Sequence, residues 1–484
     1  MKWLIPSLLF ILIFAMAART PLDTDLWWHL RAGEATWNSR QPVLVDQTSF
    51  TRAGAPWTNH SWLAQIALYL LFQCGGFLAI SGLIALAAAF SMFLVYRQMD
   101  GAPLMRAFIL VLAAAVAAPV WSARPQIFTL VLFSGLAYLL NMYKWQKKNL
   151  LWICIPLFIL WSNLHGGYAL GLILFALTIA GESLNKILNQ DAPNTLSWNE
   201  IGGLVVWSFI SWGVVAINPN GIEMWVIPFK TVGVGVLRSA IEEWSSPDFH
   251  QLSQQPFIWM LFGAFGAIIF SRRRPEAGDF VLIAGFAYLG LLARRNFGPF
   301  AIAGAPVMAR YLSALHLDSI RLPDKLRIKS QVTLPKKVAI GINVALLGLT
   351  GLAALIKLLA VSAPAFVSEI YAQEFPIEAV QWINSNQPPG KIFNAYQWGG
   401  FLTWELRKYP VFVDGRTDLY GEELLRTYIR IHNGDFGWEE EMNRYEMNLV
   451  LVEAESGLAK VLGYDLDWKE RYKDDLAVIF TREE

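Results

Sequence analysis

Long apolar runs separated by short polar connections fill the first three quarters of the chain. A helix needs about 20 mostly apolar residues to cross the hydrocarbon layer of a membrane. Eleven runs approach or reach that length, which predicts eleven transmembrane helices. The predicted spans are residues 3–18, 76–96, 107–121, 127–143, 150–163, 168–184, 201–217, 256–270, 279–293, 299–312 and 338–361. We therefore expect an α-helical polytopic membrane protein.

The pattern changes at residue 363, where shorter apolar runs begin to alternate with helix-like stretches. Four runs resemble strands, and they are residues 391–395, 409–414, 448–453 and 477–481. The helix-like stretches are residues 377–384, 422–430, 439–445 and 456–462. A segment of about 110 residues is large enough for one hydrophobic core. The sequence thus predicts a transmembrane domain of residues 1–362 and a small α/β domain of residues 363–484.

Clusters of Lys and Arg orient the predicted spans, because basic residues are retained on the cytoplasmic side of short loops. When the eleven spans alternate in direction, all of these clusters fall on one side. The clusters are Arg97 and Arg106; Lys144, Lys147 and Lys148; Arg272, Arg273 and Arg274; and Arg327, Lys329, Lys336 and Lys337. This predicts a cytoplasmic N-terminus, outer loops at residues 19–75 and 218–255, and an extracytoplasmic C-terminal domain.

The first apolar run has a second interpretation. Lys2, the apolar stretch and the small-residue triplet Ala15-Met16-Ala17 also fit a secretory signal peptide with a cleavage site. Cleavage leaves the orientation of the remaining spans unchanged. Both interpretations therefore place the residues that follow the first run outside.

Composition agrees with a membrane protein and narrows the function. Hydrophobic residues make up 55% of the 484 residues and charged residues only 16%, whereas about a quarter of an ordinary soluble domain is charged. A formal net charge of +1 gives no electrostatic reason to expect a nucleic acid partner. Cys74 and Cys154 form neither a disulfide framework nor a zinc motif. The expected surroundings are membrane lipids.

An acidic, Trp-rich motif directly follows the first apolar run, with the sequence Asp23-Thr24-Asp25-Leu26-Trp27-Trp28-His29-Leu30. A carboxylate at a membrane surface costs free energy unless water, a cation or a polar partner holds it. Residues 57–74 have helical spacing and interfacial Trp residues, which predicts a helix lying on the membrane. Residues 222–255 have a similar composition and are expected to form a rim. We interpret the acidic motif as a catalytic loop.

Further motifs lie on the same predicted face or in the outer domain. They are Ala123-Arg124-Pro125-Gln126, Asn163-Leu164-His165-Gly166-Gly167, Trp398-Gly399-Gly400 and Asp414-Gly415-Arg416. With an acidic pair after the first span, a loop helix behind it and an outer C-terminal domain, the chain resembles the GT-C superfamily of membrane glycosyltransferases that depend on polyprenyl-phosphate sugars. The resemblance is strongest to a bacterial branch and covers nearly the whole chain. For Asp414 and Arg416, a turn stabilised by their own pairing is an equally good interpretation.

The resemblance implies transfer of a hexosyl or pentosyl group, with inversion, from a polyprenyl-phosphate-linked donor to an envelope glycan, lipid or protein. The reaction is expected at the outer face of the cell inner (cytoplasmic) membrane. In GT-C enzymes an acid of the first outer loop is the proposed base, and by position this is Asp25 or Asp23. Asp25 is favoured because it adjoins the Trp pair, whereas Asp23 alternatively caps a helix.

Arginines near the outer face are candidates for binding the donor phosphate. Arg294 and Arg295 follow a predicted span, and Arg124 is held by the adjacent Pro125. A guanidinium suits a phosphate because it donates two parallel hydrogen bonds. The alternative for each arginine is contact with lipid headgroups or an ion pair with an outer acid.

Histidines of the outer face are expected to support the site by hydrogen bonds or metal ligation. They are His29, His60 and His165. His165 alternatively ends a helix at a close-packed turn. A divalent cation on Asp23 and Asp25 is compatible with the residue types, but no ligand spacing specifies a metal.

Two other functions remain open for a polytopic chain. A transporter of lipid-linked glycans typically has internal repeats and ionisable residues near the bilayer midplane, whereas here the predicted spans are nearly free of charge. A polysaccharide ligase or polymerase of another membrane fold also uses lipid-linked donors. For such ligases the essential acid is expected in a late outer loop rather than after the first span.

Overall fold

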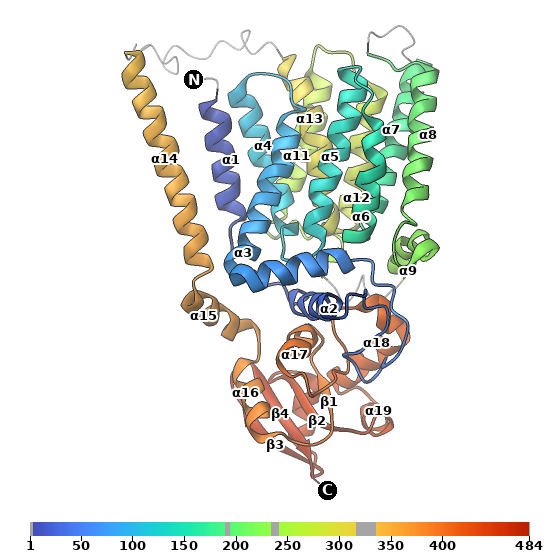
Figure 1. The fold of residues 1–484 in the computed structure, drawn as a ribbon, viewed down its shortest axis with the longest axis vertical. Helices are drawn as coiled ribbons and strands as arrows, with labels where there is room; N and C mark the ends of the chain where they lie inside the picture. The colour runs from blue at the N-terminus through green and yellow to red at the C-terminus, as the bar shows by residue number, and fades with distance from the viewer. Residues whose placement is uncertain (1–2, 189–193, 234–241, 316–334, 484) are drawn as a thin grey trace.

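The structure is a computed structural model that describes residues 3–188, 194–233, 242–315 and 335–483. Most of it is a bundle of apolar helices, with a smaller α/β domain at one end (Figure 1). The bundle helices are α1 (Leu4–Ala17), α3 (Trp62–Tyr96), α4 (Pro103–Ala117), α5 (Gln126–Trp145), α6 (Cys154–Leu164), α7 (Tyr168–Leu188), α8 (Trp198–Val214), α11 (Gln255–Phe270), α12 (Ala277–Leu292), α13 (Phe297–Ser313) and α14 (Lys336–Val361). Each predicted span overlaps one of these helices.

The length and hydropathy of the helices show which of the eleven predicted spans are long and apolar enough to cross a membrane. Within the described residues, five apolar segments are long enough to cross a membrane: Trp62–Tyr96, Pro103–Val120, Gln126–Trp145, Tyr168–Leu188 and Lys336–Val361. Four apolar helical segments are shorter: Leu4–Ala17, Leu151–Leu164, Gln255–Phe270 and Ala277–Leu292. The chain is therefore a largely helical membrane protein, and the number of eleven crossings stays a prediction.

A layer of two helices covers the end of the bundle that faces the α/β domain (Figure 1). α3 kinks at Gly75 and Gly76, and Gly76 adopts φ 53° and ψ −140°, a conformation that favours glycine. Before the kink, α3 lies across the bundle end, where the sequence predicts a surface helix. α2 (Leu26–Ser39) packs against this part of α3. A Cβ on Gly33 of α2 would lie 2.2 Å from the Gln65 carbonyl oxygen, so glycine allows the close approach.

α2 lies within residues 19–75, where the sequence predicts a loop. Its apolar residues form no long run, and its stability comes from tertiary packing rather than from periodicity. The Trp27 ring lies 6.3 Å from Phe72, 5.7 Å from Tyr371 and 5.4 Å from Phe401, measured between ring centroids. Because Tyr371 and Phe401 belong to the C-terminal part of the chain, α2 is held from both sides.

The C-terminal part contains six helices and a four-stranded sheet. The helices are α15 (Pro364–Glu374), α16 (Ile377–Asn386), α17 (Gly399–Glu405), α18 (Thr417–Asn433), α19 (Trp438–Arg444) and α20 (Gly457–Leu462). The strands are β1 (Lys391–Asn394), β2 (Met447–Glu453), β3 (Trp468–Lys473) and β4 (Ala477–Arg482). The sheet order is β1-β2-β4-β3, with β1 and β2 parallel and the other pairs antiparallel.

One predicted strand was wrong, and one strand of the sheet was not predicted. Residues 409–414 do not join the sheet; Val411 instead forms an isolated parallel bridge with Ser49 of the first outer loop. Their apolar residues are buried between the loop and the domain, which gives a strand-like pattern without a strand. β3 was not predicted because it is a charged edge strand with mostly exposed side chains, a usual property of sheet edges.

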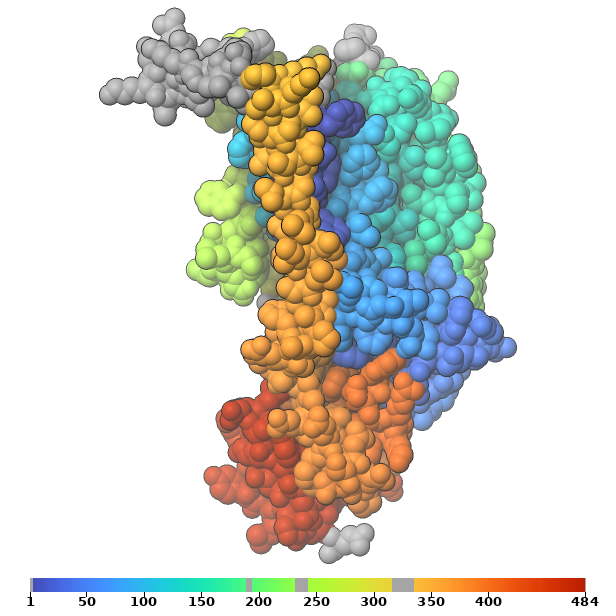
Figure 2. Space-filling model, turned by 60° about the vertical axis from the view of Figure 1, so that its left-hand side comes forward, coloured from blue at the N-terminus to red at the C-terminus, as the bar shows by residue number. Residues whose placement is uncertain are grey.

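α14 connects the bundle to the C-terminal domain along one edge of the molecule (Figure 2). Its lower end is tied to the segment that precedes the acidic motif. Lys357 Nζ donates to the Ala15 carbonyl at 2.5 Å, and Thr20 Oγ1 donates to the Val361 carbonyl at 2.8 Å. Tyr371 Oη of α15 donates to the Pro21 carbonyl at 2.5 Å. These bonds fix the C-terminal domain next to the start of α2.

The predicted basic clusters lie near the opposite end of the bundle. The loops after α3, α5 and α11 and the start of α14 are located there (Figure 1), whereas Arg327 and Lys329 lie outside the described residues. The bundle also holds buried ion pairs that the sequence analysis missed. Lys144 contacts Glu182 at 2.6 Å and Glu276 at 2.7 Å, and Arg310 contacts Asp279 at 2.5 Å. The predicted spans are therefore less free of charge than expected.

Cysteine labelling tests the predicted orientation. In a variant without Cys74 and Cys154, we expect a membrane-impermeant thiol reagent to modify Gln41→Cys and Glu455→Cys in intact cells. Lys147→Cys should react only after the membrane is opened. The side chains of Lys147 and Glu455 are 50% and 86% exposed, so accessibility does not limit labelling. Labelling of Lys147→Cys in intact cells would contradict the orientation.

Candidate active site

Asp23 and Asp25 lie at the start of α2 and face one guanidinium. The Asp25 backbone N–H donates to Asp23 Oδ1 at 3.0 Å, which closes a local turn. Arg124, from the connection before α5, places Nε 2.5 Å from Asp23 Oδ1 and Nη1 3.1 Å from Asp25 Oδ2. Arg124 Nη1 also lies 3.3 Å from Glu243 Oε2. The fold thus brings the predicted residues Asp23, Asp25 and Arg124 together. Arg124 forms ion pairs with carboxylates, which was the alternative to phosphate binding that the sequence left open.

Asp25 is a carboxyl group poised near neutral pH. Burial raises the pKa of Asp25 to about 7; Arg124 opposes this shift, and the like charge of Asp23 adds to it. Its side chain is 17% exposed, compared with 7% for Asp23. Burial also favours neutral Glu243, but Arg124 and Arg295 together lower the pKa of Glu243. A pKa near the working pH suits a group that accepts a proton.

Glu243 and Tyr396 belong to this site but were not named as site residues from the sequence. Glu243 lies in the Trp-rich segment that was predicted to form a rim, which was its only signal. Burial and the carboxylates of Asp25 and Asp414 raise the pKa of Tyr396 well above its ordinary value, so its phenol is neutral. No local pattern places Tyr396 near Asp25, because more than 370 residues of chain separate them.

The C-terminal domain closes directly over the acidic motif. A Cβ on Gly415 would lie 1.8 Å from Asp25 Oδ1 and 2.9 Å from Trp28 Nε1. A Cβ on Gly400 would lie 2.6 Å from the Thr24 carbonyl oxygen. Since real side chains do not tolerate such contacts, both positions need glycine. The two glycine motifs of the C-terminal domain therefore form one wall of the site.

Arg416 fastens this wall to the first outer loop. Its Nη1 lies 2.7 Å from Asp46 Oδ1, and its Nη2 lies 2.7 Å from Asp414 Oδ2. Nη2 also donates to Thr48 Oγ1 at 2.7 Å, and the guanidinium carbon lies 5.0 Å from the Trp57 ring centroid. The local Asp414–Arg416 pairing considered from the sequence is present. It is extended by contacts with residues more than 350 positions away.

The three histidines lie around the site as neutral side chains. Burial is the main cause that lowers the pKa of His29, His60 and His165. The rings of His60 and His165 are 6.0 Å apart between centroids. His29 is buried on α2 against Trp28, with 3.5 Å between ring centroids. At neutral pH these groups act as hydrogen-bond donors or acceptors rather than as cations.

The hydrogen bonds of His165 define its proton position. Trp161 Nε1 donates to Thr129 Oγ1 at 2.9 Å, which leaves the Thr129 hydroxyl to donate to His165 Nδ1 at 2.8 Å. The Gly167 backbone N–H also donates to Nδ1, at 3.1 Å. The proton of the neutral ring is therefore on Nε2. His165 also ends α6, as one sequence interpretation proposed, since its backbone N–H donates to the Trp161 carbonyl at 2.8 Å.

The two neighbouring arginines are placed differently. The Arg295 guanidinium carbon lies 4.0 Å from the centroid of the Trp244 ring, and its charge acts on Glu243, His60 and His165. Within the described ranges, no carboxylate is within ion-pair distance of Arg295. Arg294 instead directs Nη2 toward Ser245 Oγ at 3.4 Å. Of the predicted pair, Arg295 is thus the one with an electrostatic influence on the site.

A metal site is not evident in the described part of the chain. No group of three or more His, Cys, Asp or Glu residues is arranged there to hold a metal ion. The carboxylates of Asp23, Asp25 and Glu243 converge on the Arg124 guanidinium instead. The possible divalent cation on Asp23 and Asp25 stays a prediction from the sequence.

Replacement of Arg416 tests its role in fastening the domain. Arg416→Gln leaves the buried Asp46 and Asp414 unpaired, and loss of a partner from a buried pair costs about 3–5 kcal/mol. We expect a clear decrease in melting temperature and faster amide exchange in residues 41–57. Arg426→Gln is the matched control, because Arg426 is 65% exposed and pairs only at the surface; exposed pairs contribute roughly 0–1 kcal/mol. Equal decreases for both variants would contradict this role.

Comparisons with known proteins identify the fold. No protein-family model and no curated protein sequence matches the chain. Among solved structures, the oligosaccharyltransferase AglB from Archaeoglobus fulgidus aligns with a TM-score of 0.58 and 12% identity, over 94% of this chain and 69% of AglB. ArnT from Cupriavidus metallidurans aligns with a TM-score of 0.52 and 13% identity, over 97% of this chain and 96% of ArnT. The chain therefore shares the fold of these two proteins, as its resemblance to the GT-C superfamily implied.

Proposed function

We propose that the chain is a glycosyltransferase that moves a sugar from a polyprenyl-phosphate donor to an envelope acceptor at the outer face of the inner membrane. The observation that carries the proposal is the Asp25 carboxyl group. Its pKa is raised to about 7, it contacts Arg124 at 3.1 Å, and the Gly415 wall covers it. A buried acid with a pKa near neutrality, held in a fold of glycosyltransferases, suits the work of a general base.

The similar structures support a lipid phosphate as the donor carrier. The AglB structure is a complex with an inhibitory peptide and a dolichol-phosphate. The ArnT structure is bound to undecaprenyl phosphate. A donor on a membrane lipid also agrees with a site located where the helix bundle meets the outer domain. We extend this donor class to the present chain as part of the proposal.

In the proposed reaction, an acceptor hydroxyl gives its proton to the Asp25 carboxylate. The acceptor oxygen forms a bond with the anomeric carbon of the donor while the bond from that carbon to the phosphate oxygen breaks. The bonding electrons leave with the oxygen, so the products are the glycosylated acceptor and the polyprenyl phosphate. Attack opposite to the leaving phosphate inverts the configuration at the anomeric carbon. The developing positive charge and the departing phosphate both require electrostatic stabilisation.

Arg295 is the best candidate for contact with the phosphate. It is a half-buried cation without a carboxylate partner in the described ranges, whereas Arg124 already contacts three carboxylates. The neutral imidazole of His165 carries its proton on Nε2 and adds a possible hydrogen-bond donor. We assign Arg124 mainly to positioning Asp25 and Arg295 to the phosphate. Arg294, directed toward Ser245, has a weaker case than the sequence suggested.

The fold favours this function over the alternatives. A ligase or polymerase of another membrane fold does not account for similarity to AglB and ArnT over at least 94% of the chain. A transporter of lipid-linked glycans does not need a buried carboxyl group whose pKa is raised to about 7, as that of Asp25 is. The candidate acceptors are an envelope glycan, lipid or protein.

Replacement of Asp25 tests the proposal. In proteoliposomes that contain lipid extract from cells producing the protein, we expect Asp25→Asn to slow consumption of polyprenyl-phosphate sugars by about 100-fold or more, the usual contribution of a general base. Mass spectrometry of the lipids measures the consumption. Asp475→Asn, at an exposed aspartate of the same outer domain, should leave it unchanged. Undiminished consumption by Asp25→Asn would falsify the assignment of the base.

The pH dependence provides a second test. A base with a pKa of about 7 is inactive while protonated, so turnover should increase between pH 6 and pH 8. Asp23→Asn removes a like charge next to Asp25. Asp25 then no longer shares the Arg124 guanidinium with the Asp23 carboxylate. Both changes lower the pKa of Asp25. We therefore expect the acidic limb of the profile to move to lower pH by about one unit. A flat profile, or a shift to higher pH, contradicts the proposed electrostatics.

A further inference from the structure

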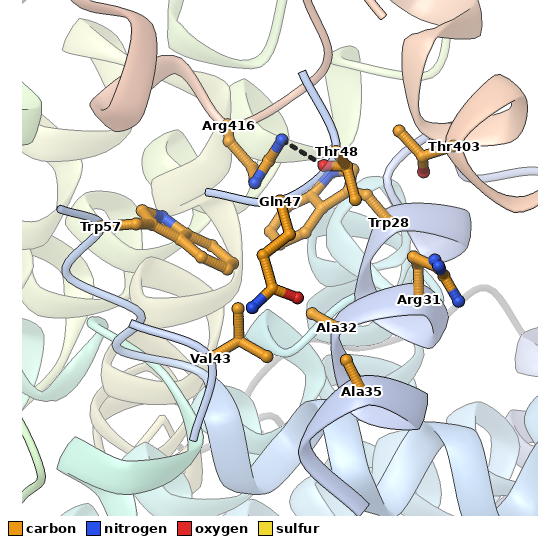
Figure 3. Close-up of a pocket in the computed structure, with 10 residues that line it drawn as sticks. All are labelled: Trp28, Arg31, Ala32, Ala35, Val43, Gln47, Thr48, Trp57, Thr403 and Arg416. Atoms are coloured by element: carbon orange, nitrogen blue, oxygen red, sulfur yellow. Dashed lines mark hydrogen bonds between the residues drawn. The ribbon is translucent and has the colours of Figure 1, made fainter. Parts of the chain in front are cut away.

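A second pocket lies on the other side of Trp28 from the acidic pair. It is a cavity of about 100 Å³ between α2, the loop of residues 43–57 and the C-terminal domain (Figure 3). The Trp28 indole lines this cavity. Its Nε1 lies on the Asp25 side of the ring, because a Cβ on Gly415 would contact both Trp28 Nε1, at 2.9 Å, and Asp25 Oδ1, at 1.8 Å. One indole ring therefore separates the pocket from the proposed base.

The walls of the pocket combine aromatic surface with uncharged polar groups. Trp28 and Trp57 are 5.9 Å apart between ring centroids and inclined by 70°. The Gln47 side chain extends between them with its amide toward the cavity (Figure 3). Gln47 is exposed and makes no hydrogen bond with any residue that the structure describes. Thr48 and Thr403 also line the cavity; the Thr48 hydroxyl accepts from Arg416 Nη2 at 2.7 Å, and the Thr403 hydroxyl donates to the Gly400 carbonyl at 2.7 Å.

One buried indole of the pocket lining lacks a partner. Trp57 is only 5% exposed, and its Nε1 has no hydrogen-bond acceptor among the described residues. Trp28 Nε1 instead lies next to the Asp25 carboxylate, on the other side of its ring from the pocket. Buried indole N–H groups normally have an acceptor. A ligand oxygen would supply the acceptor that the Trp57 N–H lacks.

The charges around the pocket favour a neutral ligand. The two arginines that line it are already paired with carboxylates. Arg31 contacts Glu34 at 2.6 Å, and Arg416 contacts Asp46 and Asp414, each at 2.7 Å. No free cation remains to recognise a phosphate or a carboxylate ligand at this pocket. An anionic ligand would compete with existing ion pairs.

We propose that this pocket binds a neutral sugar ring of the acceptor, which would make the acceptor of this enzyme a glycan. The inference rests on the proposed glycosyltransferase function. Flat faces of a pyranose ring present C–H groups that pack on indoles, while its hydroxyls bond to amides and hydroxyls such as those of Gln47 and Thr48. A water molecule needs about 10–15 Å³ of such cavity space, so the pocket holds several waters or, in their place, one sugar ring.

Ala32 and Ala35 of α2 keep the floor of the pocket open. Both are small residues on the helix face below Gln47 (Figure 3). A larger side chain at position 35 would fill the cavity without touching Asp25 or Arg124. Position 35 therefore offers a way to block the sugar without altering the proposed base.

Saturation-transfer NMR on the full chain in nanodiscs tests this proposal. The probe is the mixture of neutral oligosaccharides released by mild acid from the envelope of cells producing the protein. We expect saturation of pyranose ring protons with the unmodified protein, and at least a fivefold decrease with Gln47→Ala and with Ala35→Phe. Gln41→Ala is the matched control, because Gln41 is an exposed glutamine of the same loop outside the pocket. It should leave the signals unchanged.

The outcomes separate this inference from the proposed function. Asp25→Asn should slow turnover by about 100-fold or more but retain oligosaccharide saturation. If Gln47→Ala, which removes only an exposed side chain, leaves the saturation undiminished, the sugar pocket is wrong even when turnover depends on Asp25. Binding of envelope peptides instead of oligosaccharides would also overturn it. Pocket-dependent saturation in a protein without any transferase activity would support the sugar site and contradict the enzyme.

Discussion

Three carboxylates share a largely buried site at the end of the helix bundle that faces the C-terminal domain, because one guanidinium, that of Arg124, lies between them. The three acids come from two segments, the start of α2 and the segment before α11, and Arg124 comes from a third. Without the arginine, uncompensated negative charges would remain in a region of low solvent exposure, at a cost of several kcal/mol. The ion-pair cluster therefore ties the start of α2 to the connection before α5 and to the segment before α11.

The same cluster explains the chemical state of Asp25. Burial alone would keep the carboxyl protonated, whereas Arg124 alone would keep it ionised. These opposing effects leave the pKa of Asp25 at about 7. At neutral pH, both protonation and deprotonation of this carboxyl group therefore require little free energy. The C-terminal domain contributes to this balance by excluding water, since Gly415 brings its backbone against the carboxylate. The C-terminal domain is thus part of the site, and Arg416 keeps it in place.

Much of the architecture follows from local patterns in the sequence. Apolar runs predicted the positions of the bundle helices, and the position of Asp23 and Asp25 after the first run predicted the GT-C fold. Local patterns failed where tertiary contacts dominate. α2 depends on aromatic packing with residues near 371 and 401, and residues 409–414 pair with Ser49 instead of with the sheet.

The site shows the same division. The acids Asp23 and Asp25, Arg124, His29 and His165 stand in recognisable motifs, and the structure gathers them, together with His60, around one site. Glu243 and Tyr396 have no such motif, because only the folded chain brings them to Asp25. The difference between Arg294 and Arg295 is also invisible in the sequence, since it depends on the direction of each side chain relative to Trp244 and Ser245.

A structure of the protein with undecaprenyl phosphate, determined by electron cryomicroscopy in nanodiscs, is the most direct measurement of whether this site handles a lipid-linked donor. The account predicts phosphate density within hydrogen-bond distance of Arg295, about 3 Å, on the side of the site that holds Asp25 and Arg124. A phosphate bound away from these residues, for example at the opposite end of the bundle near Lys144 and Arg310, would contradict it.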